Sequence, residues 1–93
     1  MILYNITINI EDDVHDQWLK WMREIHIPEV MDTGMFTGFK IFKLLTAAQD
    51  NSGTNYAIQY SCESLEKFQE YERVYASEMR LKAEKHFAGK YYA

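Results

Sequence analysis

The sequence predicts a small α+β domain built on a split β-α-β arrangement. Two segments in which apolar and polar residues alternate, residues 2–10 and 54–63, are each followed by a segment of helical periodicity. A further segment rich in Phe, Ile and Leu lies between them, and a short aromatic segment closes the chain. These observations predict the order β-α-β-β-α-β. With 93 residues there is room for one hydrophobic core, so we expect a single domain over residues 1–93.

The first predicted strand, residues 2–10, has a clear apolar side and a clear polar side. Asn5, Thr7 and Asn9 share the polar side. Period two with β-branched residues is typical of a strand that buries one face. The apolar side carries Ile2, Tyr4, Ile6, Ile8 and Ile10.

Residues 14–31 are predicted to form a helix, because their apolar residues recur at helical spacing. Asp12 and Asp13 precede this helix and are expected to act as N-caps, where a negative charge also complements the helix dipole. Pro28 lacks a backbone donor and is expected to kink or end the helix. Gly34 is the expected stop.

Residues 37–46 form the second predicted strand, and residues 47–53 have the composition of a turn. The third predicted strand, residues 54–63, alternates in the same way as the first. One of its sides carries Tyr56, Ile58, Tyr60 and Cys62, and the other carries Ala57, Gln59 and Ser61.

The second helical segment is expected to begin after Ser64, a residue type favoured as an N-cap. Ser77 offers a second cap, so the pattern leaves open a break near Ala76. Gly89 is expected to end the helical segment. Residues 91–93 look like the start of a fourth strand that is short or truncated.

This order of elements is that of ferredoxin-like domains. Right-handed crossovers then place the first and third strands side by side in an antiparallel sheet, with both helices on one face. The open face would carry Asn5, Thr7, Gln59 and Ser61. Two such faces opposed in a homodimer would enclose a polar-lined space that favours water or a small organic ligand. The alternative is that these residues simply face solvent. The alternation of the residues does not distinguish an enclosed face from a solvent-exposed one.

The composition argues against several classes of partner. The formal net charge is -4, from 14 acidic and 10 basic residues, whereas nucleic acids and anionic membranes require clustered Lys and Arg. We find neither a signal peptide nor an apolar run approaching the ~20 residues of a membrane span. Cys62 is the one cysteine, and an unpaired thiol suits a reducing compartment. We therefore expect a cytoplasmic protein.

His26 is the strongest ionisable candidate for chemistry, as a general base or acid near the mouth of the barrel. The alternative is a histidine whose charged form the C-terminal end of a helix favours. His15 lies eleven residues earlier, which is about 16 Å along a helix and too far to share a metal with His26. His86 is distant in sequence and no acidic or cysteine partner has ligand spacing, so we expect no metal and no cofactor.

Other residues have two interpretations. Glu72 falls near the apolar stripe of the second helical segment, and burial there would raise the pKa of its carboxyl group. The alternative, which is more common, is that Glu72 lies at the rim of the helix interface and pairs with a Lys or Arg. Trp18 and Trp21 are interpreted as core residues rather than as a ligand-stacking pair. Cys62 has no basic neighbour that would activate it as a nucleophile.

RNA-recognition modules share this strand and helix order and carry aromatic residues on strands one and three, where Tyr4, Tyr56 and Tyr60 stand. Tyr4, however, shares its side with four isoleucines, which must face the helices. The basic-Gly-aromatic run expected on the third strand is absent, and the net charge is acidic. We therefore expect no nucleic-acid partner.

Six segments spread along the chain carry a resemblance: Tyr4-Asn5-Ile6-Thr7, His26-Ile27-Pro28-Glu29-Val30, Thr33-Gly34-Met35-Phe36-Thr37-Gly38, Tyr60-Ser61-Cys62-Glu63-Ser64, Met79-Arg80 and His86-Phe87. Together they resemble an uncharacterised bacterial family of domains of unknown function, about a hundred residues long. The resemblance spans essentially the whole chain and implies a dimeric α+β barrel, whose last strand usually continues beyond the position of Ala93. The wider group of such barrels includes cofactor-free oxygenases, haem-degrading enzymes, dehydratases and muconolactone isomerase-like proteins, and the fold does not choose among them.

The expected function is that of a homodimer that binds a small organic molecule in a polar-lined cleft between sheet and helices. As an enzyme it would be a cofactor-free oxygenase or isomerase, with His26 as base and an Asn or Gln side chain polarising a carbonyl. The alternative is a structural or regulatory dimer whose interior is filled by its own side chains. The residues expected to line the cleft are Asn5, Thr7, Gln59 and Ser61.

Overall fold

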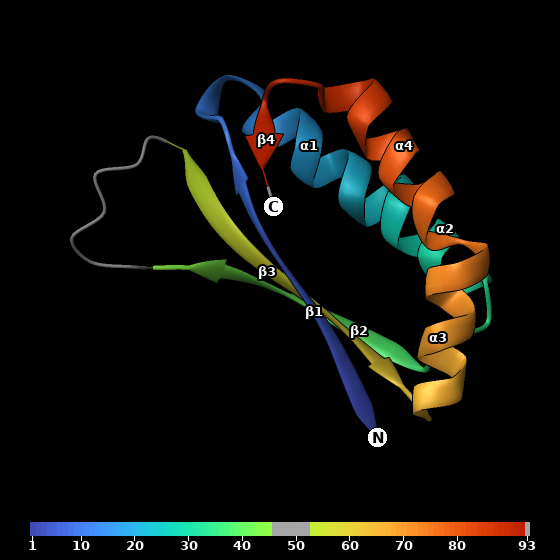
Figure 1. The fold of residues 1–93 in the computed structure, drawn as a ribbon. Helices are drawn as coiled ribbons and strands as arrows, with labels where there is room; N and C mark the ends of the chain where they lie inside the picture. Colours follow the sequence, from blue (N-terminus) through green and yellow to red (C-terminus); the bar gives the residue numbers. More distant parts are fainter. Residues whose placement is uncertain (46–52, 93) are drawn as a thin grey trace.

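The computed structural model describes residues 1–45 and 53–92 and has an α+β fold. Its four-stranded antiparallel sheet has the order β2-β3-β1-β4 (Figure 1), so the predicted central pairing of the first and third strands is confirmed. Ala93 and most of the predicted turn at residues 47–53 lie outside the described residues. The strands are β1 (Ile2–Ile10), β2 (Gly38–Leu44), β3 (Thr54–Cys62) and β4 (Tyr91–Tyr92).

The first helical segment runs from α1 (His15–Trp21) through a π-helical turn (Met22–His26) into α2 (Ile27–Asp32). Pro28 lies in the first turn of α2, where its missing N–H is tolerated. The wider π turn directly precedes α2, and the Ile27 N–H donates to the carbonyl of Met22. The proline is therefore accommodated by a local widening of the helix rather than by its end.

The second helical segment breaks next to Ala76, at the place where the sequence left a break open. Helix α3 (Leu65–Val74) is followed at Tyr75 by α4 (Ala76–Phe87). The Ser64 side chain accepts a hydrogen bond from the Lys67 N–H at 3.2 Å, which confirms the predicted N-cap.

The expectation that Asp12 and Asp13 act as N-caps was wrong. These residues begin a 3-10 turn (Asp12–Val14), and the residues that precede that turn and α1 make no side-chain capping bond. Both carboxylates instead hold other parts of the chain together. Asp12 Oδ1 accepts a bond from the Thr54 hydroxyl at 3.3 Å, and Asp13 Oδ2 lies 2.8 Å from Lys90 Nζ.

All the helices lie on one side of the sheet, and the other side is uncovered (Figure 1). The apolar side of β1 faces the helices and packs with the corresponding side of β3. Burial of one such isoleucine stabilises the fold by about 1.5–3 kcal/mol. The predicted placement of both tryptophans is confirmed, since they are buried. The most deeply buried side chains are Trp18, Tyr60, Ile10, Ile27, Ile58, Val30 and Cys62.

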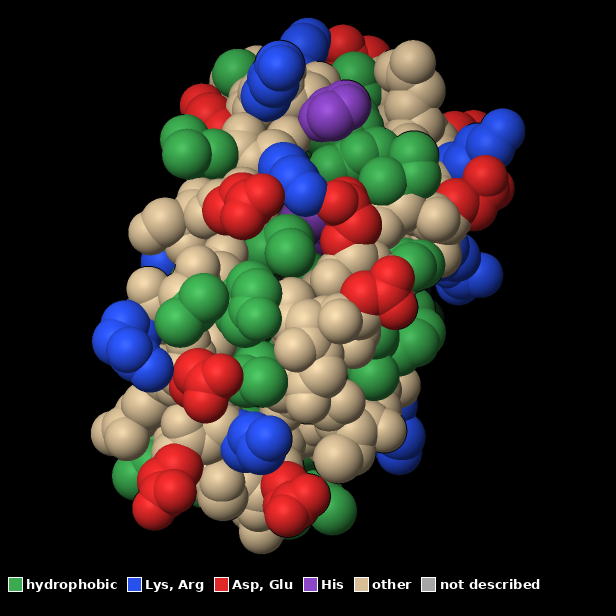
Figure 2. All heavy atoms as spheres, turned by 90° about the vertical axis from the view of Figure 1, so that its right-hand side faces the viewer, with side chains coloured by type: hydrophobic (Ala, Val, Ile, Leu, Met, Phe, Trp, Pro, Cys, Tyr) green, Lys and Arg blue, Asp and Glu red, His purple; other side chains and the backbone are tan. Residues whose placement is uncertain are grey.

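The surface of the helical layer carries interspersed acidic and basic side chains (Figure 2). This view shows no broad area of one charge. Among residues 1–45 and 53–92, no helix is long and apolar enough to cross a membrane.

Candidate functional site

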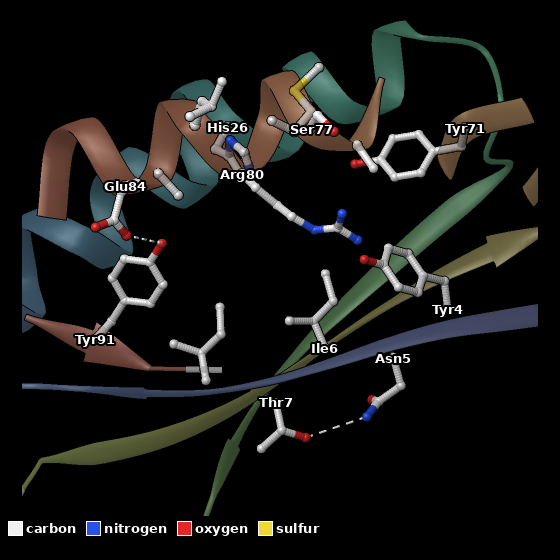
Figure 3. Close-up of a pocket in the computed structure, with 15 residues that line it drawn as sticks. Tyr4, Asn5, Ile6, Thr7, His26, Tyr71, Ser77, Arg80, Glu84 and Tyr91 are labelled. Atoms are coloured by element: carbon white, nitrogen blue, oxygen red, sulfur yellow. Dashed lines mark hydrogen bonds between the residues drawn. The ribbon is translucent and has the colours of Figure 1, made fainter. Parts of the chain in front are cut away.

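A groove with a volume of about 920 Å³ lies between β1 and helix α4 (Figure 3). Ile6 and Ile8 of β1 form its floor. Ala76, Met79 and Ala83 of α4 line the opposite wall. The volume falls within the range of small-molecule sites, and the lining is mostly apolar, as in such sites.

Polar groups stand at the two ends of the groove. At one end the Tyr91 hydroxyl donates to Glu84 Oε2 at 3.3 Å. At the other end Arg80 donates to both carboxylate oxygens of Glu72, each at 3.2 Å. Hydrogen bonds to Tyr4 and to Glu72 raise the pKa of the Arg80 guanidinium. Figure 3 shows this guanidinium extended toward the Tyr4 hydroxyl across the end of the groove.

Aromatic rings close the groove beyond Arg80. The Tyr4 ring lies 5.0 Å from the ring of Phe68 and 6.0 Å from that of Tyr71. Phe36 packs edge-on against Tyr71 at 4.8 Å. Burial raises the pKa of Tyr71 to about 12, so its phenol stays protonated at neutral pH and acts as a hydrogen-bonding group.

His26 lines the helix side of the groove and stacks on Trp21, with ring centroids 4.6 Å apart and an angle of 17° between the planes. Its Nδ1 atom is buried and has no hydrogen-bond partner. Burial lowers the pKa of His26, and the nearby Lys82 and His86 act in the same direction, against Glu29. The imidazole is therefore neutral at pH 7, which is the form a general base requires.

The four predicted lining residues do not all meet at the groove. Asn5 lies opposite Gln59 in the β1–β3 pairing, and Ser61 lies opposite Leu3. Their positions place these residues and Thr7 on the open face of the sheet, away from the helices. The side chains of Asn5 and Thr7 contact each other there, with Nδ2 and Oγ1 3.4 Å apart (Figure 3). Asn5 and Thr7 also border the groove, whereas Gln59 and Ser61 do not line it.

The remaining candidates have structural partners. Glu72 is paired with Arg80, as the interpretation of a rim residue predicts. His15 Nε2 lies 2.6 Å from the Tyr56 hydroxyl. Cys62 is a buried thiol. No group of three or more His, Cys, Asp and Glu side chains in the described part of the chain is placed to hold a metal ion.

The comparison with family models decides the family. The model of a family described as a domain of unknown function (DUF4286) matches residues 1–93. The chain belongs to the DUF4286 family. No curated protein and no solved structure matches this DUF4286 chain. The family description names no reaction, so the function of the chain is argued from its groove.

Reasoning from the sequence missed the polar residues that α4 contributes to the groove of this DUF4286 chain. Ser77, Arg80 and Glu84 follow one another at spacings of three and four residues, which places them on one side of a helix. Ala76 and Ala83 are small, and small residues leave space beside a strand. These spacings were visible in the sequence, but which side of α4 faces β1 depends on how the helix packs on the sheet.

The lowered pKa of His26 predicts a pH-dependent stability. Below its ordinary pKa of 6.5, the unfolded chain binds a proton that the folded chain resists. The free energy of unfolding should therefore decrease as the pH falls from about 7.5 to about 5. His26→Phe, which keeps a ring on Trp21, should reduce this decrease, as measured by urea denaturation at each pH.

His86→Phe is the matched control, because His86 also packs beside Trp21, with ring centroids 5.1 Å apart. This variant removes only the smaller effect of His86 on His26 and leaves its burial, so it should keep most of the pH dependence of the unsubstituted chain. Equal pH dependence in the His26→Phe variant and the unsubstituted protein would contradict the assignment of a neutral, buried His26.

Proposed function

We propose that this DUF4286 chain is a binding protein whose groove between β1 and α4 takes a small organic molecule. The observation that carries the proposal is the groove itself, with about 920 Å³ of space, an apolar floor and wall, and polar groups at its two ends. Such a site favours a mostly apolar ligand with one polar or anionic group.

Arg80 is the residue best placed to recognise that polar group. Its side chain comes from α4 and spans the groove toward Tyr4. Arg80 donates two hydrogen bonds to Glu72 through one guanidinium nitrogen. The other N–H groups of the guanidinium can donate to a ligand. The hydroxyls of Tyr4 and Tyr71 offer neutral hydrogen bonds beside it. A carboxylate or another hydrogen-bond acceptor fits this end of the groove.

We further propose that two copies pair through the open faces of their sheets, as in a ferredoxin-like dimeric α+β barrel. The strand order β2-β3-β1-β4, with the helices on one face, supports this architecture. The open face mixes Asn5, Thr7 and Gln59 with exposed Leu3 and Phe42. Under this proposal these polar residues line the space between the two sheets, in the reducing cytoplasm where the free Cys62 is stable.

A second candidate is a cofactor-free oxygenase or isomerase that uses the same groove. The neutral imidazole of His26 at the groove wall favours it, because a base of this type abstracts a proton from a bound substrate. The dimer without a ligand remains the third candidate, and a groove that binds no small molecule would support it.

The binding proposal predicts that a bulky side chain in the groove blocks an apolar anion. Titration with 8-anilinonaphthalene-1-sulfonate, followed by its fluorescence, should show binding to the unsubstituted protein. Ala83→Trp should weaken this binding about tenfold or more, since it fills the wall of the groove. Arg80→Met should also weaken it, because the sulfonate loses its charged partner.

Ala88→Trp is the matched control, because Ala88 is exposed at the end of the same helix and does not line the groove. It should bind the dye as the unsubstituted protein does. Equal weakening by Ala83→Trp and Ala88→Trp, or dye binding that neither variant affects, would count against the groove as the site.

The dimer proposal predicts that a charge on the open face separates the two copies. Phe42 pairs with Ala57 and is 43% exposed, whereas Phe39 pairs with Tyr60 on the helix side and is 47% exposed. Phe42→Glu should give a monomer by light scattering, because an unpaired charge is costly between two sheets. Phe39→Glu should stay a dimer. A monomeric unsubstituted protein at micromolar concentration would refute the proposal.

A further inference from the structure

Lys40 stands on the open face of the sheet, among side chains that carry no charge. It lies opposite Gln59 in the β2–β3 pairing, and Gln59 lies opposite Asn5 in the β1–β3 pairing. Directly opposite residues in a sheet have Cβ atoms about 4.5–5.5 Å apart, so the three side chains form a row across three strands. The other open-face residues of β1, β2 and β3, all within the described part of the chain, are uncharged.

The ammonium group of Lys40 has no counter-charge within one copy. In the described residues the ion pairs are made by other basic side chains, and neither Lys40 nor Gln59 has a side-chain hydrogen-bond partner. Glu63 is the acidic residue that follows β3, but it is four residues beyond Gln59, or about 13 Å along a strand. Lys40 is exposed, so water screens its charge in a single copy.

The proposed dimer would make this charge unfavourable. Two open faces that oppose each other take Lys40 of both copies out of water. In a twofold dimer the second copy presents the same face, so the opposing strands supply no carboxylate. A charge that is buried without a partner is strongly destabilising, whereas a charge that is buried with a counter-ion is tolerated. The dimer is therefore favoured when an anion enters together with the lysines.

We infer that the space between the two open faces binds a small oxyanion, a carboxylate or phosphate group, which pairs with Lys40. The inference rests on the dimer of the proposed function and concerns a site separate from the groove. The ammonium group supplies the charge, and the side-chain amides of Gln59 and Asn5 donate further hydrogen bonds to the oxygen atoms. The second copy completes the site, because it covers the anion and presents the same row.

The distribution of charge also favours this face for an anion. The chain has a formal net charge of -4, whereas the open-face side chains of β1, β2 and β3 carry a single positive charge. An anion that approaches the protein is repelled by most of its surface and attracted to this face.

The dimer dissociation constant tests the inference, measured by analytical ultracentrifugation at constant ionic strength. Millimolar inorganic phosphate or acetate in place of chloride should tighten the dimer. The logarithm of the dissociation constant should fall against the logarithm of the anion concentration, with a slope of about -1 for one shared anion or about -2 for two. A response to either anion supports the inference, and the anion that acts at the lower concentration identifies the group.

Lys40→Met removes the charge and keeps most of the side-chain stem. Without phosphate or acetate, this variant should dimerise about tenfold or more tightly than the unsubstituted protein, because no unpaired charge is buried. Its dissociation constant should no longer respond to phosphate. Lys43→Met is the matched control, because Lys43 is exposed on the same strand but lies opposite Tyr56 on the helix side. The control should respond to phosphate as the unsubstituted protein does.

Gln59→Leu tests the amide row. This variant should remain a dimer but should need about tenfold more phosphate for the same tightening, because one donor to the anion is lost. Thermal melts by circular dichroism show that each variant is folded. A response equal to that of the unsubstituted protein would overturn the assignment of the amide row to the site.

The remaining outcomes separate the inference from the dimer proposal. A weaker dimer in Lys40→Met would show that a carboxylate of the second copy pairs with Lys40. Dimers of equal strength with no phosphate response would show that Lys40 extends into solvent at the edge of β2. A phosphate response that persists in Lys40→Met would be a general effect of the salt. Each of these results overturns the inference and leaves the dimer standing, whereas a monomer at every phosphate concentration would overturn both.

Discussion

The antiparallel pairing of β1 with β3 is the interaction on which the rest of the structure depends. It runs from Ile2 opposite Cys62 to Ile10 opposite Thr54 without a bulge. Because side chains in a strand alternate, this register places the apolar sides of both strands under the helices and their polar sides on the open face. A shift of β1 by one residue would turn its apolar side to the open face and bury Asn5 in place of Ile6.

The same pairing leaves β1 unequal on its two sides. One side is fully bonded to β3, whereas β4 covers only the end at Asn9 and Ile10. Each backbone bond contributes only about 0.5–1.5 kcal/mol when water is the alternative partner, so an open edge is tolerated where solvent reaches it. Helix α4 stands beside this edge and converts it into a groove. In the described residues, the groove thus lies where α4 passes beside the part of β1 that β4 does not pair.

Much of the fold could be predicted from local patterns. Alternation located β1 with the bounds that the structure has, the Ser64 cap is present, and the break between α3 and α4 falls next to Ala76. Asp12 and Asp13 were predicted as caps because residue type suggests a local partner, but the structure gives them partners distant in sequence, Thr54 and Lys90. Local preference does not determine which of two hydrogen-bond partners prevails.

The candidate site was harder to predict for the same reason. The polar alternation on β1 and β3 correctly placed Asn5 and Gln59 on the same face of the sheet, but it carried no information about the space on the helix side. That space depends on which side of α4 faces β1. Arg80 becomes important only once this is known, because it reaches the groove from a helix far along the chain from Tyr4.

Amide hydrogen exchange of β1 tests the central claim most directly. If one edge is open, the N–H groups of Tyr4, Ile6 and Ile8, which point to β3, should be protected. Those of Leu3, Asn5 and Thr7 should exchange at least about tenfold faster. Residue-resolved exchange by nuclear magnetic resonance distinguishes the two sets. Uniform protection of all six amides would show that the edge is already covered and would contradict the account.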